Sequence, residues 1–213
     1  RSRFQVEVEA AAQLQHPNIA QVYEVGEDNG QPFMAMEFCS GGTLESRIRD
    51  KPQPPREAAQ MVATLADALH HAHQVGIIHR DIKPGNVMIC ERGRTHDVAK
   101  LLDFGLVRTH FTDEGDDRLT RQGTVIGTPQ FMSPEQVRGE SCDGRSDLFS
   151  LGSVAYGMCT GHEPFRAENV YGVLQRIVHD ANDIWTIDLA RNVPSRFTFS
   201  PDVDDDPVWS PDG

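Results

Sequence analysis

The sequence predicts an α+β fold, because two β-prone runs, a long amphipathic helix and a nearly all-apolar helix follow one another along the chain. The β-prone runs, Ala20–Val25 and Phe33–Phe38, flank Asn29-Gly30, a dipeptide that strongly favours a hairpin turn. Residues 147–160 are apolar on nearly every side, so we expect that helix to be buried. A helix over 56–75 is expected to bury one face, formed by Val62, Leu65, Ala66, Leu69 and Ala72.

The remaining elements are shorter and are separated by turn residues. An Ala-, Glu- and Gln-rich stretch over 3–15 predicts a helix that ends at His16-Pro17-Asn18. Gly76 fits a C-terminal cap of the first long helix, and Gly161 and Pro164 are expected to end the second. Further elements are expected as a short polar helix that follows the turn Ser40–Thr43 and runs to about Arg49, strands at Val87–Cys90 and Val98–Leu102, and a long loop over 106–132.

Composition and charge limit the classes of function. The 213 residues suffice for one domain, and 38% hydrophobic and 24% charged residues are typical of a globular protein. A net charge of −12 argues against nucleic acid as a partner, because phosphate backbones require a basic surface. No apolar run approaches the roughly 18 residues that a membrane span needs. The four cysteines lack metal-ligand spacing, which favours a reducing compartment such as the cytoplasm.

The strongest chemical signal is the eight-residue run His79-Arg80-Asp81-Ile82-Lys83-Pro84-Gly85-Asn86. Asp103-Phe104-Gly105 follows it, and then come Gly127-Thr128-Pro129 and Ser133-Pro134-Glu135. Phosphoryl transfer requires a carboxylate near the attacking hydroxyl, oxygen ligands for Mg²⁺ and a cation for the moving phosphate. These motifs supply each group, and their combined length, order and spacing argue against a chance match.

On these motifs, residues 1–180 resemble a bacterial Ser/Thr protein kinase of the eukaryotic-like, or Hanks, type. The resemblance implies a protein kinase-like fold with an incomplete small lobe, a mainly α-helical large lobe and a short β-rich tail. It also implies transfer of the γ-phosphate of ATP to Ser or Thr hydroxyls of protein substrates, with Mg²⁺ or Mn²⁺ as the metal. Self-association for autophosphorylation and a membrane anchor elsewhere in the parent protein are compatible with it, and the kinase part is expected in the cytoplasm.

Four residues form the catalytic set that the resemblance implies. Asp81 resembles the catalytic base that orients the substrate hydroxyl, and Lys83 resembles the lysine that contacts the γ-phosphate. The place of Lys83 two positions after Asp81 is typical of Ser/Thr rather than Tyr kinases. Asn86 and Asp103 resemble the magnesium ligands.

Residues 33–39 resemble the last strand of the small lobe and the hinge between the lobes. Backbone groups of Glu37 and Cys39 are then expected to meet the edge of adenine, with Met36 at the gatekeeper position. Met88 is expected under the adenine ring, a role that is compatible with an ordinary core methionine because adenine sites are apolar.

Other residues are expected to regulate the site. Glu7 matches the helix glutamate that pairs with a strand lysine in active kinases, with Glu9 as the nearby competitor. Arg80 marks kinases that loop phosphorylation activates, since a phosphothreonine at Thr120 or Thr124 would supply its counter-charge.

Three further features concern support of the catalytic loop. Thr128 resembles the threonine that helps to hold Asp81 and Lys83. Asp147 resembles the buried aspartate that braces the loop, and it can also serve as a helix N-cap. Histidines of the long helix have a spacing that metal ligands use, but no acidic pattern accompanies them, so surface or packing roles are expected for His70, His71 and His73.

The chain departs from the family pattern at two points. It contains no Gly-x-Gly-x-x-Gly loop and no strand lysine for the α- and β-phosphates, so the phosphates would lack a lid and Glu7 its partner. Glu135 normally pairs with an arginine further along, and without it a buried carboxylate would cost roughly 3–5 kcal/mol. We therefore expect a piece of a kinase domain, cut at both ends.

Residues 181–213 differ in character and are expected to form a separate unit. Phe199-Ser200-Pro201-Asp202 and Trp209-Ser210-Pro211-Asp212-Gly213 echo one motif. Together, Asp183–Leu189, Arg196-Phe197-Thr198 and Pro207–Gly213 resemble one blade of a TolB-like or WD-repeat propeller. One blade cannot bury its own apolar face, so this tail is expected to pack poorly. A catalytically inactive, kinase-like module that binds partner proteins is therefore the alternative to an active kinase.

Overall fold

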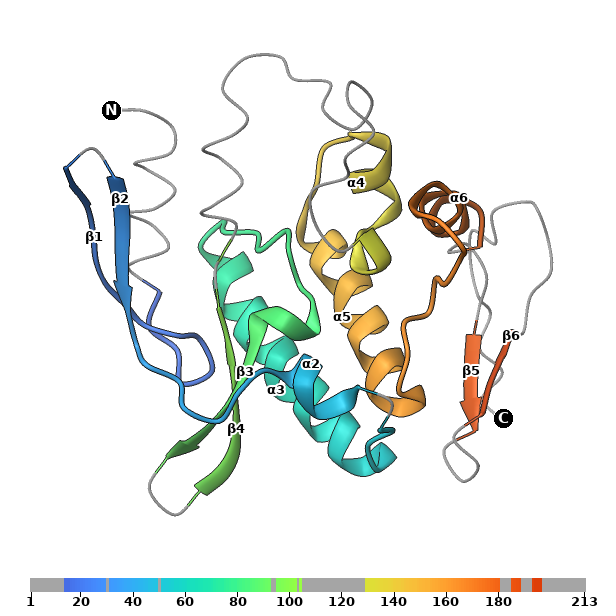
Figure 1. Ribbon diagram of the computed structural model, residues 1–213, viewed down its shortest axis with the longest axis horizontal. Coiled ribbons are helices and arrows are strands. Elements are labelled where there is room, and N and C mark those ends of the chain that lie inside the picture. Colours follow the sequence, from blue (N-terminus) through green and yellow to red (C-terminus); the bar gives the residue numbers. More distant parts are fainter. Residues whose placement is uncertain are drawn as a thin grey trace.

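Figure 1 shows the fold of the chain as a computed structural model. Hairpin β1–β2 (Val22–Asp28 and Gln31–Met36) lies at one end, helices α3 (Pro55–Gln74) and α5 (Gly144–Thr160) lie in the middle, and helix α6 (Val170–Asp180) lies beyond α5. No helix among the described residues combines the length and the apolar character needed to cross a bilayer. The described residues are 14–29, 31–49, 51–92, 95–102, 104, 129–180, 185–188 and 193–196.

The first hairpin confirms the prediction made from Asn29-Gly30. Strands β1 and β2 pair antiparallel, with Asp28 opposite Gln31 beside the turn. Asn29 has a left-handed backbone with φ of 50°, which tight hairpin turns require and which asparagine tolerates better than most residues. The observed strands are shifted towards the turn: β1 ends at Asp28 rather than at the predicted Val25, and β2 begins at Gln31 rather than at the predicted Phe33.

Helix α3 confirms the predicted amphipathic helix. Pro55 stands in its first turn, and Gly76 follows its end with a left-handed backbone (φ 79°), as a C-terminal cap requires. The buried face packs against α5. It consists of Ala58, Leu65, Ala68, Leu69 and Ala72.

Helix α5 begins at Gly144 rather than at the predicted position, because its N-cap is Asp143 and not Asp147. The Asp143 carboxylate accepts a hydrogen bond from the N–H of Arg145 at 2.8 Å, which satisfies a free donor of the first turn. The helix is buried over most of its surface. The expectation of burial nevertheless fails at Leu148, which is 54% exposed.

Strands β3 (Val87–Arg92) and β4 (Thr95–Leu101) form the predicted second hairpin. The short 3-10 turn η1 (Pro84–Asn86) leads directly into β3. An isolated bridge between Thr43 and Met88 joins this hairpin to the chain that follows β2. The loop containing His79 and the segment after β2 therefore meet at the same hairpin.

Helix α2 (Leu44–Ile48) follows that bridge and confirms the predicted short helix. Its N-cap, Thr43, accepts a hydrogen bond from the N–H of Ser46 at 3.2 Å. Just before it, the backbone at Gly41 approaches β3 so closely that a Cβ would lie 1.8 Å from the carbonyl oxygen of Ile89. Only glycine can occupy that position without moving the segment.

Two helices and a turn had no counterpart among the predicted elements. Helix α4 (Pro134–Arg138) follows the 3-10 turn η3 (Pro129–Phe131) and begins with a capping box between Ser133 and Gln136. Helix α6 buries Val173 and Ile177 against Phe165, which forms a second, smaller core cluster. The Ser-x-x-Gln spacing of the capping box is the local signal that the sequence offers for α4.

A third hairpin lies in the tail. Strand β5 (Trp185–Asp188) pairs antiparallel with β6 (Val193–Arg196). This pairing is compatible with the expected β-rich tail. The division of the chain at residue 180 stays a prediction.

The main core lies between α3, α5 and hairpin β3–β4. Leu69, Val154 and Leu101, one from each of these elements, have no exposed surface. Complete burial of a side chain of this kind contributes about 1.5–3 kcal/mol. The helix predicted over 3–15 lies outside the described residues except for its last two, Leu14 and Gln15, which are not helical.

His79 is a polar residue with no exposed surface beside this core. Its Nε2–H donates to the carbonyl oxygen of Leu102 at 2.8 Å, and its Nδ1 accepts from the N–H of Asp81 at 3.3 Å. Both ring nitrogens are thus used in the neutral form. Burial lowers the pKa of His79 and outweighs the opposing effect of nearby Asp147, because an imidazolium here would lose its hydration.

We expect the free energy of unfolding to decrease as the pH falls below about 6.5, the ordinary pKa of histidine in an unfolded chain. Below that pH the unfolded chain binds a proton that buried His79 takes up only at its lower native pKa. In His79→Phe this part of the pH dependence should disappear, whereas Phe104→Leu, which loosens the packing on the same ring, should keep it. Urea denaturation across this pH range measures both slopes, and parallel curves for the wild type and His79→Phe would contradict the prediction.

Candidate active site

The loop over 79–86 is held at its start by a buried aspartate of helix α5. Asp147 is 1% exposed and accepts the N–H of His79 through Oδ2 and the N–H of Arg80 through Oδ1, both at 2.8 Å. Nε2 of His73, from helix α3, donates to Oδ2 at 2.7 Å. Asp147 therefore joins α3 and α5 to the loop, which confirms its predicted bracing role.

Arg80 has a left-handed backbone with φ of 64°, a rare conformation that costs energy in a residue other than glycine. Its N–H is held by Asp147, and its carbonyl oxygen accepts a hydrogen bond from Nε2 of Gln136, in helix α4, at 2.7 Å. Both partners are distant in sequence, so tertiary contacts maintain the strained turn. That turn sets the direction in which the chain continues to Asp81.

Asp81, Lys83 and Asn86 converge around one carboxylate. Nζ of Lys83 donates to Asp81 Oδ2 at 2.8 Å, and Nδ2 of Asn86 donates to the same oxygen at 2.9 Å. Nδ2 of Asn86 also donates to the backbone carbonyl of Asp81 at 2.8 Å, which leaves Oδ1 of Asn86 as an acceptor. The side chains of Asp81 and Lys83 are 29% and 23% exposed, so a ligand can approach them.

Asp103 lies outside the described residues, but its chain neighbours lie against this loop. The N–H of Leu102 donates to the carbonyl oxygen of Asn86 at 2.9 Å, and the Leu102 carbonyl accepts from His79. The rings of Phe104 and His79 lie 4.7 Å apart, centroid to centroid. The role predicted for Asp103 as a metal ligand stays a prediction.

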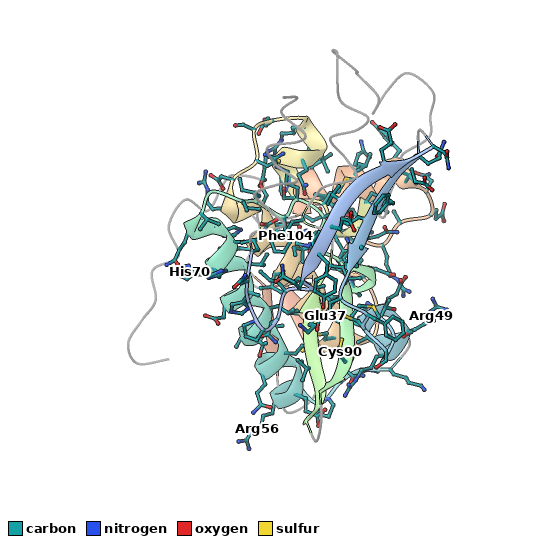
Figure 2. All side chains as sticks on the ribbon, turned by 90° about the vertical axis from the view of Figure 1, so that its left-hand side faces the viewer. Glu37, Arg49, Arg56, His70, Cys90 and Phe104 are labelled. Atoms are coloured by element: carbon teal, nitrogen blue, oxygen red, sulfur yellow. The ribbon has the colours of Figure 1, made fainter. Side chains whose placement is uncertain are left out.

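Glu37 follows β2 directly and is fixed by contacts on both its backbone and its side chain. Its N–H donates to the carbonyl oxygen of Gln21 at 2.8 Å, and its carboxylate accepts from the N–H of Gln21 at 3.3 Å. The same carboxylate oxygen lies 2.7 Å from Nζ of Lys100, a buried lysine of strand β4. Figure 2 shows Glu37 where the first hairpin meets β3 and β4. The sequence analysis did not identify Lys100.

Cys39 and Met88 lie at the same junction. Burial, and next the contact with the thiol of Cys90 on β3, raises the pKa of Cys39 to about 12. A thiol with that pKa is protonated at neutral pH and is a poor nucleophile. Met88 stands two residues before Cys90 on the same strand and bridges Thr43. The structure therefore brings the residues predicted for adenine to one junction between β2 and β3.

The other predicted site residues divide into two groups. Arg80 is described, and it is exposed. Its predicted role in regulation stays a prediction. The remaining predicted residues lie outside the described part of the chain: Glu7 with its competitor Glu9, and Asp103, Thr120, Thr124 and Thr128.

Glu135 has a partner that the sequence analysis did not identify. The hydroxyl of Ser146, in the first turn of α5, donates a hydrogen bond to Oε1 of the partly buried Glu135. Burial raises the pKa of Glu135, but hydrogen bonds from Ser146, its own backbone and Ser133 outweigh burial, so the pKa lies below its ordinary value. Hydrogen bonds therefore stabilise this carboxylate, and its pairing with an arginine stays a prediction.

The histidines of α3 show packing roles. His73 binds Asp147, and the ring of His71 lies 5.3 Å from the ring of His16, centroid to centroid. In the described ranges, no three metal-ligating side chains gather in one place. His73 nevertheless has an acidic partner, which no local sequence pattern indicated.

Comparison with known proteins identifies the family to which this chain belongs. The protein kinase domain family matches residues 1–205. Serine/threonine-protein kinase PknB of Mycolicibacterium smegmatis is 42% identical over 183 residues, which are 84% of this chain and 28% of that protein. Serine/threonine-protein kinase pkn3 of Myxococcus xanthus is 42% identical over 174 residues, which are 80% of this chain and 32% of that protein. PknB of Mycobacterium tuberculosis is 40% identical, with 84% and 28% covered.

This chain spans about a third or less of the length of these curated relatives. The family match, in contrast, extends over nearly the whole sequence. The chain therefore belongs to the protein kinase domain family.

Proposed function

We propose that the protein is a Ser/Thr protein kinase that transfers the γ-phosphate of ATP to Ser or Thr hydroxyls of protein substrates. The observation that carries this proposal is the convergence of Lys83 and Asn86 on the carboxylate of Asp81, in a loop that Asp147 braces. The names of the relatives, serine/threonine-protein kinases, support the same reaction.

Asp81 would accept a hydrogen bond from the substrate hydroxyl and orient its oxygen towards the phosphate. Its carboxylate is partly exposed, as contact with a substrate requires. The ammonium of Lys83 and the amide of Asn86 hold the carboxylate in one orientation, which lowers the entropy cost of aligning the hydroxyl. Lys83 also supplies a cation for the transferring phosphate.

The donor set fits a hard divalent cation. Oxygen atoms are the ligands that Mg²⁺ prefers, and Mn²⁺ accepts the same donors. Asn86 offers its amide oxygen, and Asp103 would offer a carboxylate. The bound metal would neutralise charge on the phosphates. The adenine would lie at the junction of Glu37, Cys39 and Met88, beside a strand that carries the buried core residues Val87 and Ile89.

Regulation is proposed through the residues that the family resemblance singled out. Phosphorylation of Thr120 or Thr124 would supply an anion for Arg80, and two copies of the chain would have to meet for one to phosphorylate the other. Glu7 would pair with the strand lysine that binds the phosphates, and Thr128 would help to hold Asp81 and Lys83. We place the kinase part in the cytoplasm.

A groove near helix α6 suits a polypeptide substrate. It has a volume of about 770 Å³, and its lining includes Gln130, which follows the Gly127-Thr128-Pro129 motif in the sequence. Charges of both signs line it, including Glu163, Arg166 and Arg176.

The tail is proposed to be a separate β-rich unit over 181–213, of the propeller-blade type. The antiparallel pairing of β5 with β6 supports the β character of this segment. The family match extends to residue 205, so the proposed boundary at residue 180 depends on the change in sequence character alone.

We expect a form of the protein extended upstream in the same reading frame to phosphorylate itself at Thr120 or Thr124 when Mg²⁺ or Mn²⁺ and labelled ATP are present. Asp81→Asn should reduce the rate by about 10²–10⁴-fold, the usual contribution of an acid–base group. Transfer of label, followed by mapping of the phosphorylated threonine, measures both effects. Chelation of the metal should also abolish the transfer.

The exposed Asp67→Asn is a matched control, because Asp67 lies on α3 away from the catalytic loop and should leave the rate unchanged. An extended wild type that transfers no phosphate with either metal would refute the kinase proposal. That result would favour the inactive module that binds partner proteins.

The chain without such an extension is expected to bind ATP weakly, with a dissociation constant of about a millimolar or more. The physical reason is that its sequence contains no Gly-x-Gly-x-x-Gly loop to enclose the phosphates. Titration calorimetry with Mg-ATP measures the affinity. Micromolar binding by this chain would show that the loop is not needed.

A further inference from the structure

Lys100 carries a buried charge that the proposed reaction does not use. It is 4% exposed, and its Nζ lies 2.7 Å from Oε2 of Glu37. In the part of the chain that the structure describes, this is the only ion pair of Lys100. Removing both charges from water offsets much of their attraction, so a buried ion pair contributes little to stability in general. A role in positioning explains its presence better.

The surroundings of Lys100 indicate what it positions. It pairs with the side chain of Glu37, and its charge acts on the thiol of Cys39. It also stands directly opposite Met88 in the β3–β4 ladder, and opposite residues of antiparallel strands project from the same face. Lys100 therefore contacts Glu37 and stands opposite Met88, two of the three residues proposed to surround adenine.

We propose that Lys100 is a positioning residue for the adenine end of the nucleotide site. By binding the Glu37 carboxylate, it fixes the backbone of residues 37–39, whose polar groups would contact the edge of adenine. This inference rests on the proposed kinase function and adds a residue that the family motifs do not include.

The contacts explain how the positioning works. The Glu37 side chain is held by Lys100 and by the N–H of Gln21, and the Glu37 N–H is held by the Gln21 carbonyl. Without Lys100, a carboxylate that is only 28% exposed would lose the ammonium that lies 2.7 Å from it, and it would turn towards water. The backbone of Glu37 would move with it, and the contacts with adenine would be lost.

The phosphate end of the site should be unaffected. Lys83 and Asn86 hold Asp81 through contacts that do not include Lys100. The expected signature is therefore selective: binding of the adenine part weakens, while binding of the triphosphate and the rate of the chemical step stay as they are.

The test compares Lys100→Met, Glu37→Gln and the double variant Lys100→Met/Glu37→Met with the wild type, all in the upstream-extended form. Substituting the Glu37 side chain retains the backbone N–H and carbonyl groups of residue 37, so these variants remove the ion pair without deleting the groups that would contact adenine. The double variant leaves no unpaired charge and keeps the test valid if Lys100→Met alone does not fold. The exposed Lys51→Met is the matched control.

Titration calorimetry with adenosine and with Mg-tripolyphosphate, and steady-state kinetics with ATP, give the readouts. In all three variants we expect adenosine affinity to fall and the KM for ATP to rise by about tenfold or more, with tripolyphosphate affinity and kcat within about twofold of the wild type. Lys51→Met should match the wild type in every measurement.

A double variant that folds and binds adenosine as the wild type does would overturn the inference while leaving the kinase proposal intact. So would a fall in kcat with KM unchanged, because it would place the effect of Lys100 at the catalytic end. A wild type that neither binds adenosine nor transfers phosphate would refute the kinase function and this inference with it.

Discussion

The geometry of the candidate site depends on one buried carboxylate. Asp147 accepts hydrogen bonds from two consecutive backbone N–H groups, those of His79 and Arg80, and from the ring of His73. Hydrogen bonds to a charged group contribute about 1.5–3 kcal/mol each, which is enough to offset the roughly 1–3 kcal/mol of strain in a left-handed residue such as Arg80. Asp147 belongs to helix α5, which packs on α3. The packing of the main core therefore determines the position of the loop.

Hairpin β3–β4 connects the two ends of the site. Asn86 leads into β3, and Leu102, which leaves β4, donates its N–H back to the carbonyl oxygen of Asn86. Two positions further along, Met88 lies opposite Lys100 and beside the segment that follows β2. The same hairpin therefore joins Asn86, proposed for the metal, to Met88, proposed for the adenine, so a shift of this hairpin would move both.

The sequence was sufficient where the interacting residues are close along the chain. Asp81, Lys83 and Asn86 lie within six positions, so their motif predicts their meeting, and Asn29-Gly30 alone predicts the first hairpin. Contacts between distant segments had no local signal, and neither had the choice between two aspartates for the N-cap of α5. Four side chains whose contacts were missed for this reason each bind a partner at least eleven positions away along the chain: His73, Lys100, Gln136 and Ser146.

The contact between the thiols of Cys39 and Cys90 has a chemical consequence. Electrophiles and oxidants attack the thiolate form of cysteine, and a group with a pKa of about 12 supplies almost none of it at neutral pH. Cys39 is therefore a poor attachment point for thiol-directed covalent inhibitors, even though it borders the proposed adenine site. The same property slows oxidation of the Cys39 thiol itself, because oxidants react with the thiolate.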